Sequence, residues 1–237
     1  VLSELQLMVS KVTECMDAYD NYGACQSIES FLDGLSNWYV RRSRDRFWAK
    51  DRESVDKSDA YWTLYECLVT MAKVVAPFVP FVSETIWRNL SGVFGDQTPE
   101  SVHLCDYPTA NEQWQDDVLS ERMALLREVA SLGRSARMEA KLKVRQPLAL
   151  VEVILANPEH QGWLADHGKI LANELNVKEV AYTQDAEEYI NYLVQPNFKR
   201  VGPRVGKLMP KVKKWLNTAD GASLLAEMKA NGHVSTE

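Results

Sequence analysis

The stretch KLKVRQPLALVEVIL, residues 141–155, separates two kinds of sequence along the chain. Before it, apolar residues recur at intervals of three and four, which is the period of one face of an α-helix. From Leu148 to Leu155 aliphatic and β-branched residues follow one another, a run typical of a buried strand. Pro147 disfavours helical geometry in the residue before it, so a helix should end here. The stretch therefore predicts a mainly α-helical domain over residues 1–142, followed by a small α/β (α+β) domain over residues 143–237.

Five helices are predicted in the first domain. The first carries an apolar stripe at helical spacing, formed by Leu5, Met8, Val9, Val12 and Met16. The second begins at Asp20 or Asn21, either of which can serve as an N-cap, and runs through Trp48. The other three are expected at residues 57–75, 82–90 and 112–141. On the third helix an aromatic and aliphatic stripe is expected in the core, formed by Tyr61, Trp62, Leu64, Tyr65, Leu68 and Met71.

The second domain is expected to mix strands and helices. Strands are predicted at 148–155, 177–183 and 188–194, a helix at 162–175, and a basic helix at 203–216. Pro203 suits the start of that last helix, whereas Pro210 should kink or restart it. In the first domain, a short extended piece is expected at 101–104.

Composition excludes several classes of protein. The 237 residues contain no apolar run long enough to span a bilayer, so no membrane association is expected. The N-terminus shows no signal-peptide pattern and no methionine, which leaves open that the chain is a fragment. The four cysteines lack CxxC spacing and the four histidines form no cluster, which favours a reduced cytoplasmic protein without a metal site. No nucleophile–base pair, phosphate loop or paired-carboxylate site is recognisable, so no catalytic residue is predicted.

Positive charge is gathered in three segments of an otherwise acidic chain. Residues 41–52 and 134–145 each carry a net charge of +4, and residues 199–214 carry +7. Because the whole chain has a net charge of −6, the remaining residues carry −21. Such islands favour contact with a polyanion.

The first island overlaps the segment NWYVRRSRDRFW, residues 37–48. At 100° per residue, Arg42 and Arg46 continue the apolar stripe, so we expect them to be structural cations paired with carboxylates of neighbouring helices. Arg41 and Arg44 point to another side. With Trp38 they suit the binding of RNA phosphates and unpaired bases, although a solvated charged face explains their spacing equally well.

The second island ends in the connector before the first strand. Cations at a helix C-terminus complement the helix dipole, and this explains their placement. It does not explain the alternation of Lys141, Lys143 and Arg145, which would place all three on one side of an extended segment. Lys143 and Arg145 are therefore further candidates for RNA contact.

The third island begins with NFKRVGPRVGK, residues 197–207. Backbone amides after Pro203 could receive a phosphate. In a continuous helix, Arg204, Lys207, Lys211 and Lys214 would share one arc; the alternative is a solvated amphipathic helix, and both can hold together. The candidates for RNA contact in this island are Phe198, Lys199, Arg200, Arg204 and Lys207.

Several separated blocks resemble one known family, in the same order along the chain. They are SNWYVRRSR (36–44), Tyr61 with TLY (63–65), APF (76–78) with Pro80, Phe81 and Glu84, SVHL (101–104), KVRQPL (143–148), ELNVK (174–178), PNFK (196–199), GPR (202–204) and GK (206–207). Together they resemble the C-terminal portion of the isoleucyl-tRNA synthetase family, of the eukaryote-like type.

The resemblance implies a helical-bundle anticodon-binding domain followed by a small α/β domain. A parent enzyme of this family activates isoleucine with ATP and magnesium and transfers it to its tRNA. Its catalytic HIGH- and KMSKS-type signatures and its editing domain are missing here, so the chain alone should be non-catalytic and hold no cofactor. The family's C-terminus lies well beyond Glu237, which leaves a truncated second domain open.

The partners implied are the anticodon arm of the tRNA for isoleucine and the parent's own catalytic domain, in a cytoplasmic monomer. A different class of function also remains, a basic-faced helical scaffold that docks an acidic protein or a domain without RNA specificity.

Overall fold

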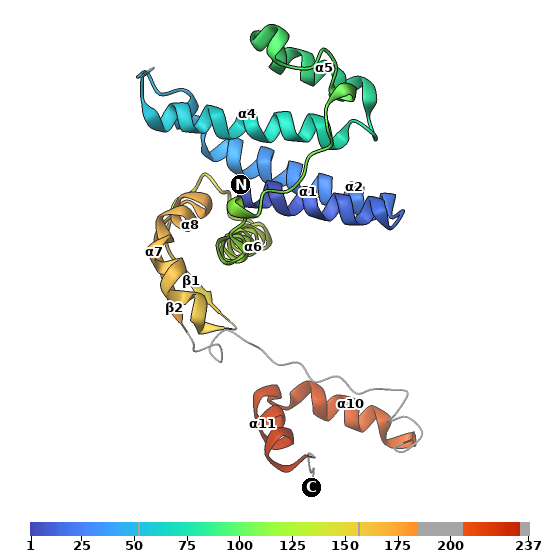
Figure 1. Ribbon diagram of the computed structural model, residues 1–237. Helices are drawn as coiled ribbons and strands as arrows, with labels where there is room; N and C mark the ends of the chain where they lie inside the picture. Colours follow the sequence, from blue (N-terminus) through green and yellow to red (C-terminus); the bar gives the residue numbers. More distant parts are fainter. Residues whose placement is uncertain (52, 156, 184–205, 233–237) are drawn as a thin grey trace. The chain divides into compact units, whose positions relative to one another are not determined.

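A computed structural model describes residues 1–51, 53–155, 157–183 and 206–232 (Figure 1). The predicted class is confirmed, because the described chain is mainly α-helical with one small parallel sheet. Two compact units divide at Leu125, inside helix α6 (Asp117–Glu139). The domain boundary predicted at residues 142–143 stays a prediction. No helix in these described ranges is both long and apolar enough to cross a membrane.

The core of the first unit lies between α1 (Leu2–Asp17), α2 (Asn21–Asp33) and α4 (Val55–Val75). In Figure 1 α1 and α2 lie side by side. The side chain of Asp20 accepts a hydrogen bond from the backbone N–H of Gly23 at 2.9 Å and so caps α2 as predicted. The buried side chains of this core are Leu5, Met8, Val9, Val12, Cys15, Ala24, Ile28, Phe31, Leu35, Cys67, Met71 and Val74.

The single helix predicted from Asp20 to Trp48 is wrong in its second half. After α2 the chain continues as a π-helical segment, η1 (Gly34–Val40), and a short helix α3 (Arg44–Phe47) follows a break at Ser43. A π-helical turn holds more residues than an α-helical turn, so the 100° spacing used to place Arg42 and Arg46 does not apply here. Ser43 is only 4 % exposed, so it is buried at this break in the helix.

A second, smaller cluster joins α4 to α5 (Pro80–Ser91). Its buried members are Ala72, Ala76, Trp87 and Val102. The indole N–H of Trp87 donates to the carbonyl of Pro99 at 3.0 Å, which fixes the chain beyond the short 3₁₀ helix η2 (Gly92–Gln97).

The extended piece predicted at 101–104 is instead a 3₁₀ turn, η3 (Val102–Leu104). The Ser101 hydroxyl accepts a hydrogen bond from the backbone N–H of His103 at 3.2 Å. Glu84 on α5 accepts from the Ser101 hydroxyl at 2.9 Å and from the N–H of Val102 at 3.0 Å. These side-chain caps favour a turn over a strand.

The same contacts make the stability of this turn depend on pH. Burial alone raises the pKa of Glu84, but hydrogen bonds from Ser101 and Val102 and the nearby charge of Arg88 outweigh it, so the pKa lies below its ordinary value. A lowered folded pKa contributes stability above the ordinary value of 4.5, and this is lost as the pH falls through the folded value.

We therefore expect the urea midpoint of the first unit to fall below about pH 4.5, and less steeply in Glu84→Gln. The midpoint is measured between pH 6 and pH 3, with Glu100→Gln, an exposed carboxylate on the following loop, as the control. Equal slopes for the chain and Glu84→Gln would contradict the assignment.

The aromatic stripe predicted on α4 is only partly in the core. Met71 is 5 % exposed, but Tyr61 is 50 % and Trp62 is 60 % exposed. Periodicity placed both rings on the helix, but the packing around α4 leaves half or more of each side chain exposed, although Tyr61 contacts the ring of Phe47 on α3. The prediction that they are core residues is therefore wrong.

The second unit contains a strand–helix–strand arrangement. Strand β1 (Leu148–Ile154) pairs in parallel with β2 (Val177–Thr183), with Leu148 opposite Val177, and β2 has the bounds predicted. The predicted helix 162–175 is divided into α7 (Gln161–Asp166) and α8 (Gly168–Leu175) at His167, after the 3₁₀ turn η5 (Pro158–His160). The expected strand at 188–194 lies outside the described residues.

Helix α6 packs closely on α8 in this unit. It is shorter than the predicted 112–141, since a separate turn, η4 (Glu112–Trp114), precedes it. A Cβ on Gly133 would lie 2.7 Å from the two terminal methyl carbons of Leu175, so a larger residue here would force the Leu175 side chain to shift. Arg134 and Glu174 form an ion pair at 3.0 Å, with the carboxylate side chain only 3 % exposed.

The last described segment holds η6 (Gly206–Leu208), α10 (Met209–Thr218) and α11 (Gly221–Asn231). Pro210 occupies the first turn of α10, so the predicted restart of the helix is confirmed. Gly206 has a φ of +48°, which no continuous right-handed helix contains. The condition for a shared arc of Lys207, Lys211 and Lys214, one continuous helix, is therefore not met, because Lys207 belongs to η6 and the other two to α10; Arg204 lies outside the described residues.

Candidate functional site

Two arginines gather around Trp38 on segment η1 and just after it. The guanidinium of Arg42 lies 5.4 Å from the centre of the indole ring, and that of Arg41 lies 6.0 Å from it. The Nε of Arg41 also donates to the carbonyl of Asn37 at 2.8 Å, which holds this exposed side chain along the segment. Trp38 thus has two cations near its ring, an arrangement that suits phosphate and base contacts.

A second pair follows one turn later. The guanidinium of Arg44 lies 5.2 Å from the ring centre of Trp48, which is 70 % exposed. Sequence reasoning did not select Trp48, which it treated only as the end of a helix. The signal was present, because Trp48 lies within a segment that also contains four arginines.

Arg46 has a different environment. Its Nε donates to both carboxylate oxygens of Asp56 at 3.0 Å, and a terminal nitrogen donates to the Asp56 carbonyl at 3.1 Å. The hydrogen bond to Asp56 is the main cause of a pKa of Arg46 above its ordinary value. Lys57 adds a bond to the carbonyl of Ala49 at 2.7 Å, so these contacts fasten α3 to the start of α4. The roles assigned to Arg42 and Arg46 stay predictions.

The connector after α6 is not the extended segment that was expected. Lys141 has a left-handed backbone, with φ of +56°, and the N–H of Leu142 donates to the carbonyl of Arg137 at 2.8 Å. The N–H of Lys141 donates to Met138 at 3.0 Å, which completes a Schellman-type end to the helix. A turn then joins the N–H of Gln146 to the carbonyl of Lys143 at 3.0 Å. Alternation therefore does not place Lys141, Lys143 and Arg145 on one side.

Two side chains hold this connector (residues 140–147) in place. Arg137, 5 % exposed, donates to the carbonyls of Val144, at 3.3 Å, and Gln146. Asn176, at the end of α8, donates to the same Val144 carbonyl at 3.0 Å. Sequence reasoning missed both side chains, since Arg137 acts on carbonyls 7 and 9 residues away and Asn176 on one 32 residues away, beyond the spacing of a single helix turn.

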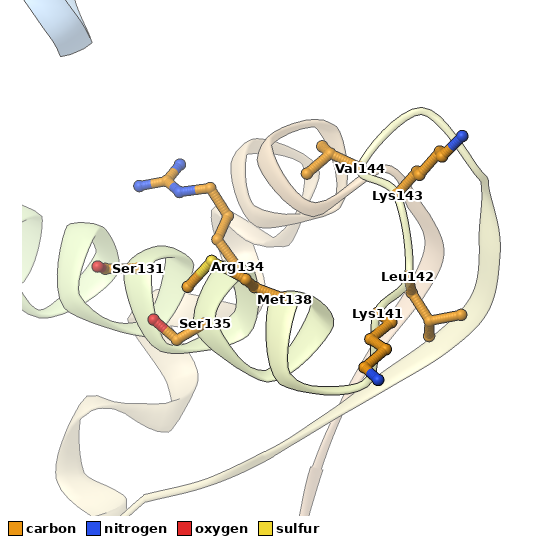
Figure 2. Close-up of a pocket in the computed structure, with 8 residues that line it drawn as sticks. All are labelled: Ser131, Arg134, Ser135, Met138, Lys141, Leu142, Lys143 and Val144. Atoms are coloured by element: carbon orange, nitrogen blue, oxygen red, sulfur yellow. The ribbon is translucent and has the colours of Figure 1, made fainter.

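An open hollow of about 570 Å³ lies beside this connector, and Figure 2 shows the side chains that line it. Its lining consists of Ser131, Arg134, Ser135, Met138, Lys141, Leu142, Lys143 and Val144. In Figure 2 the side chains of Lys141 and Lys143 point in different directions. The cations thus offer separate charges, which suits an extended polyanion better than one small anion.

The third island contributes little to the described structure. Phe198, Lys199, Arg200 and Arg204 lie outside the described residues, and Lys207 belongs to the turn η6. Among the residues with described positions, no three His, Cys, Asp or Glu side chains are placed to hold a metal ion.

Comparison with known proteins assigns the chain to a family. Isoleucine–tRNA ligase of Chlamydia trachomatis serovar D is 41 % identical over 216 residues, covering 91 % of this chain and 20 % of the relative. That of Clostridium acetobutylicum is 38 % identical over 238 residues, covering 100 % of this chain and 22 % of the relative. The chain thus spans about a fifth of the length of the curated relatives it matches. Residues 1–154 match the model of the anticodon-binding domain of tRNA ligase, and the chain belongs to that family.

Proposed function

We propose that this chain is the part of an isoleucine–tRNA ligase that binds the anticodon arm of the tRNA for isoleucine. The parent protein would activate isoleucine with ATP and magnesium and transfer it to the tRNA, through domains that are not part of this sequence. The observation that carries the proposal is the family match over residues 1–154, which contain the exposed arginine–tryptophan pairs. The eukaryote-like type stays a prediction.

The geometry supports an electrostatic and stacking mode of binding. Arg41 and Arg44 have exposed side chains and lie against indole rings, so each can meet a phosphate without first leaving a buried environment. Lys143 and Arg145 lie on a connector whose backbone is already fixed by Arg137 and Asn176. Pre-ordered cations reduce the entropy lost on binding.

Charge reversal tests the proposal. We expect Arg41→Glu/Arg44→Glu to weaken binding of the tRNA for isoleucine by at least about ten-fold, since two phosphate contacts are lost. The slope of log affinity against log salt should fall by about 1 to 2. Fluorescence anisotropy with labelled tRNA at several salt concentrations measures both.

The control is Lys11→Glu/Lys178→Glu, which makes the same change in net charge at exposed lysines outside the basic segments. The affinity of this control for the tRNA should stay within about two-fold of that of the unsubstituted chain, because only the long-range electrostatic attraction changes. Equal weakening of tRNA binding in both double variants would mean that the loss comes from the change in net charge and not from contacts made by Arg41 and Arg44. Equally poor binding of the tRNA and of a scrambled polyanion by the unsubstituted chain would instead favour a protein-docking scaffold.

We further propose that the chain is a monomer, works in the cytoplasm, docks on the parent's catalytic domain and holds no cofactor of its own. Light scattering after size exclusion gives the mass of the particle directly. A mass of two chains or more would contradict the monomer.

A further inference from the structure

One end of the first unit carries large apolar side chains that face solvent. At the corner between α4 and α5, Phe81 is 87 %, Val82 is 58 % and Val79 is 45 % exposed. At the turn between α1 and α2, Tyr19 is 93 % and Tyr22 is 74 % exposed. We call these five residues the end surface. Apolar side chains that gather in this way commonly mark a site of protein contact, because leaving them in water is unfavourable.

Both turns belong to the same end of the first unit. Met16, near the end of α1, and Phe78, in the corner after α4, pack against the same core cluster. In Figure 1 the α1–α2 turn and the α4–α5 corner lie at one end of this helical unit, and the start of α4 lies at the other. Arg44 and Trp48 lie at that other end, because α3 is fastened to the start of α4. The end surface is therefore separate from the arginine–tryptophan pairs.

The backbone at Tyr19 is strained. Its φ is +56°, in the left-handed region that bulky residues rarely adopt. The N–H of Tyr19 donates to the carbonyl of Met16 at 3.0 Å, and the N–H of Asp20 donates to that of Cys15 at 2.8 Å. Tyr19 thus holds the position at which a helix commonly ends on glycine, and a tyrosine here makes the fold less stable than glycine would. Strain at so exposed a side chain points to a contact that the side chain makes with another surface.

Hydrogen bonds hold the end surface in one arrangement. The Gln26 side chain donates to the Tyr22 hydroxyl at 2.9 Å. The hydroxyl of Ser83, which is fully buried, donates to the carbonyl of Pro80 at 2.9 Å, and Pro80 occupies the first turn of α5. Side chains on a backbone that is already fixed lose little freedom when a partner covers them. This favours a stable contact with a folded protein.

Charge disfavours RNA at the end surface. No Lys, Arg or His occurs in residues 12–40 or 74–87, which together contain six acidic residues. Lys11 and Arg88, which flank these segments, each pair with a carboxylate, at 3.3 and 2.7 Å. Such a surface repels a phosphate backbone, whereas it suits a protein with an apolar centre and a few Lys or Arg residues at its rim.

We propose that the end surface docks on a domain of the parent protein outside these 237 residues, one with an apolar centre and a basic rim. This inference rests on the proposed function and adds to it the surface through which the docking takes place. The relatives have room for such a domain, because this chain covers only 20 % of the length of one and 22 % of another. An apolar surface that is both exposed and ordered favours a permanent neighbour over a transient one, since obligate interfaces are the more hydrophobic class.

Oxidation of side chains by hydroxyl radicals tests the proposal. It is measured in the 237-residue chain and in the full-length ligase that contains it, both without tRNA. We expect Tyr19 and Phe81 to be oxidised at least about five-fold more slowly in the full-length protein, because an interface removes most of their solvent exposure. Trp62, which is 60 % exposed on the first turns of α4, should react at rates within about two-fold of each other in the two proteins, since it lies outside the interface.

Phe81→Asp places a charge in the proposed interface. In the 237-residue chain it should change the Tm by less than about 2 °C, because the position is 87 % exposed. In the full-length protein it should restore Tyr19 oxidation to the rate seen in the chain, since an unpaired charge disfavours docking when it is buried. Val93→Asp is the matched control, because Val93 is 80 % exposed on η2, beyond the other end of α5, and its substitution should leave Tyr19 protected.

Tyr19→Gly removes a contact while it stabilises the fold. We expect the Tm of the 237-residue chain to rise by about 2 to 4 °C, because the backbone strain is relieved. In the full-length protein the same substitution should speed the oxidation of Phe81, and a less stable fold could not explain that change. A lower Tm in Tyr19→Gly would contradict the strain assigned to this residue.

The outcomes separate this inference from the proposed function. Equal oxidation of Tyr19 and Phe81 in both proteins, with aminoacylation by the full-length protein intact, overturns the inference alone and assigns the surface to a separate partner. Slow oxidation of both side chains already in the 237-residue chain also overturns it, and a rate that falls further as the chain concentration rises assigns the surface to a second copy. A full-length protein that transfers no isoleucine to its tRNA overturns the proposed function, whatever the oxidation rates.

Discussion

Trp87→Ala should lower the free energy of unfolding of the first unit by about 4 kcal/mol, the usual cost of removing a large buried aromatic side chain. Trp87 is 4 % exposed and is the largest member of the cluster formed with Ala72, Ala76 and Val102. Three contributions are lost together. The side chain fills the space between α4 and α5, its N–H satisfies the Pro99 carbonyl at 3.0 Å, and the Lys73 ammonium lies 5.4 Å from its ring centre.

The measurement is hydrogen exchange of α4 and α5 peptides as a function of urea, which reports opening of this part of the chain. Trp62→Ala is a matched control, because it removes the same side chain from a position that is 60 % exposed on the same helix pair. It should change stability by less than about 0.5 kcal/mol. Trp87→Phe should fall between the two, since it keeps most of the packing and leaves the Pro99 carbonyl without its donor. A cost for Trp87→Ala as small as that for Trp62→Ala would contradict the packing argument.

Arg137→Ala is expected to destabilise the second unit by about 3 kcal/mol, since it opens a cavity and frees two carbonyls of the connector. Arg137 is 5 % exposed and bonds to the carbonyls of Val144 and Gln146. Its Nε and Nη1 atoms are buried and make no hydrogen bond within the described structure. Burial of these two donors opposes folding, so Arg137→Met, which keeps most of the volume and removes them, should cost only about 1 kcal/mol.

Hydrogen-exchange rates of the backbone amides between Leu142 and Leu148 measure the effect on the connector that Arg137 holds. Both variants should speed exchange there, because the carbonyls of Val144 and Gln146 lose a donor. A destabilisation by Arg137→Met as large as that by Arg137→Ala would contradict the cost assigned to the two unpaired donors. Unchanged exchange in both would show that Asn176 alone holds the connector.

Only those parts of the site that depend on local sequence pattern were predicted from the sequence. Charge clustering selected Arg41 and Arg44, and the structure shows both side chains exposed beside indole rings. It did not find Trp48, Tyr61 and Trp62 as surface residues, because helical periodicity places a side chain on a face but does not say whether that face is covered. The hydrogen bond from the Asn176 side chain to the Val144 carbonyl was not predicted either, since the two residues lie 32 positions apart along the chain.

Local chemistry in the sequence was enough for the α-helical class, the Asp20 cap, the apolar stripe of α1, both described strands and the restart at Pro210. Each depends on interactions within a few residues, so period, caps and proline geometry suffice. The π-helical segment Gly34–Val40 and the turn at Lys143–Gln146 were not predicted. The Val144 carbonyl within that turn is held by Asn176, which is distant along the chain, and the exposure of Tyr61 and Trp62 depends on which other elements pack on α4. Packing partners and hydrogen-bond donors from other elements select among conformations that the local sequence leaves nearly equal in free energy.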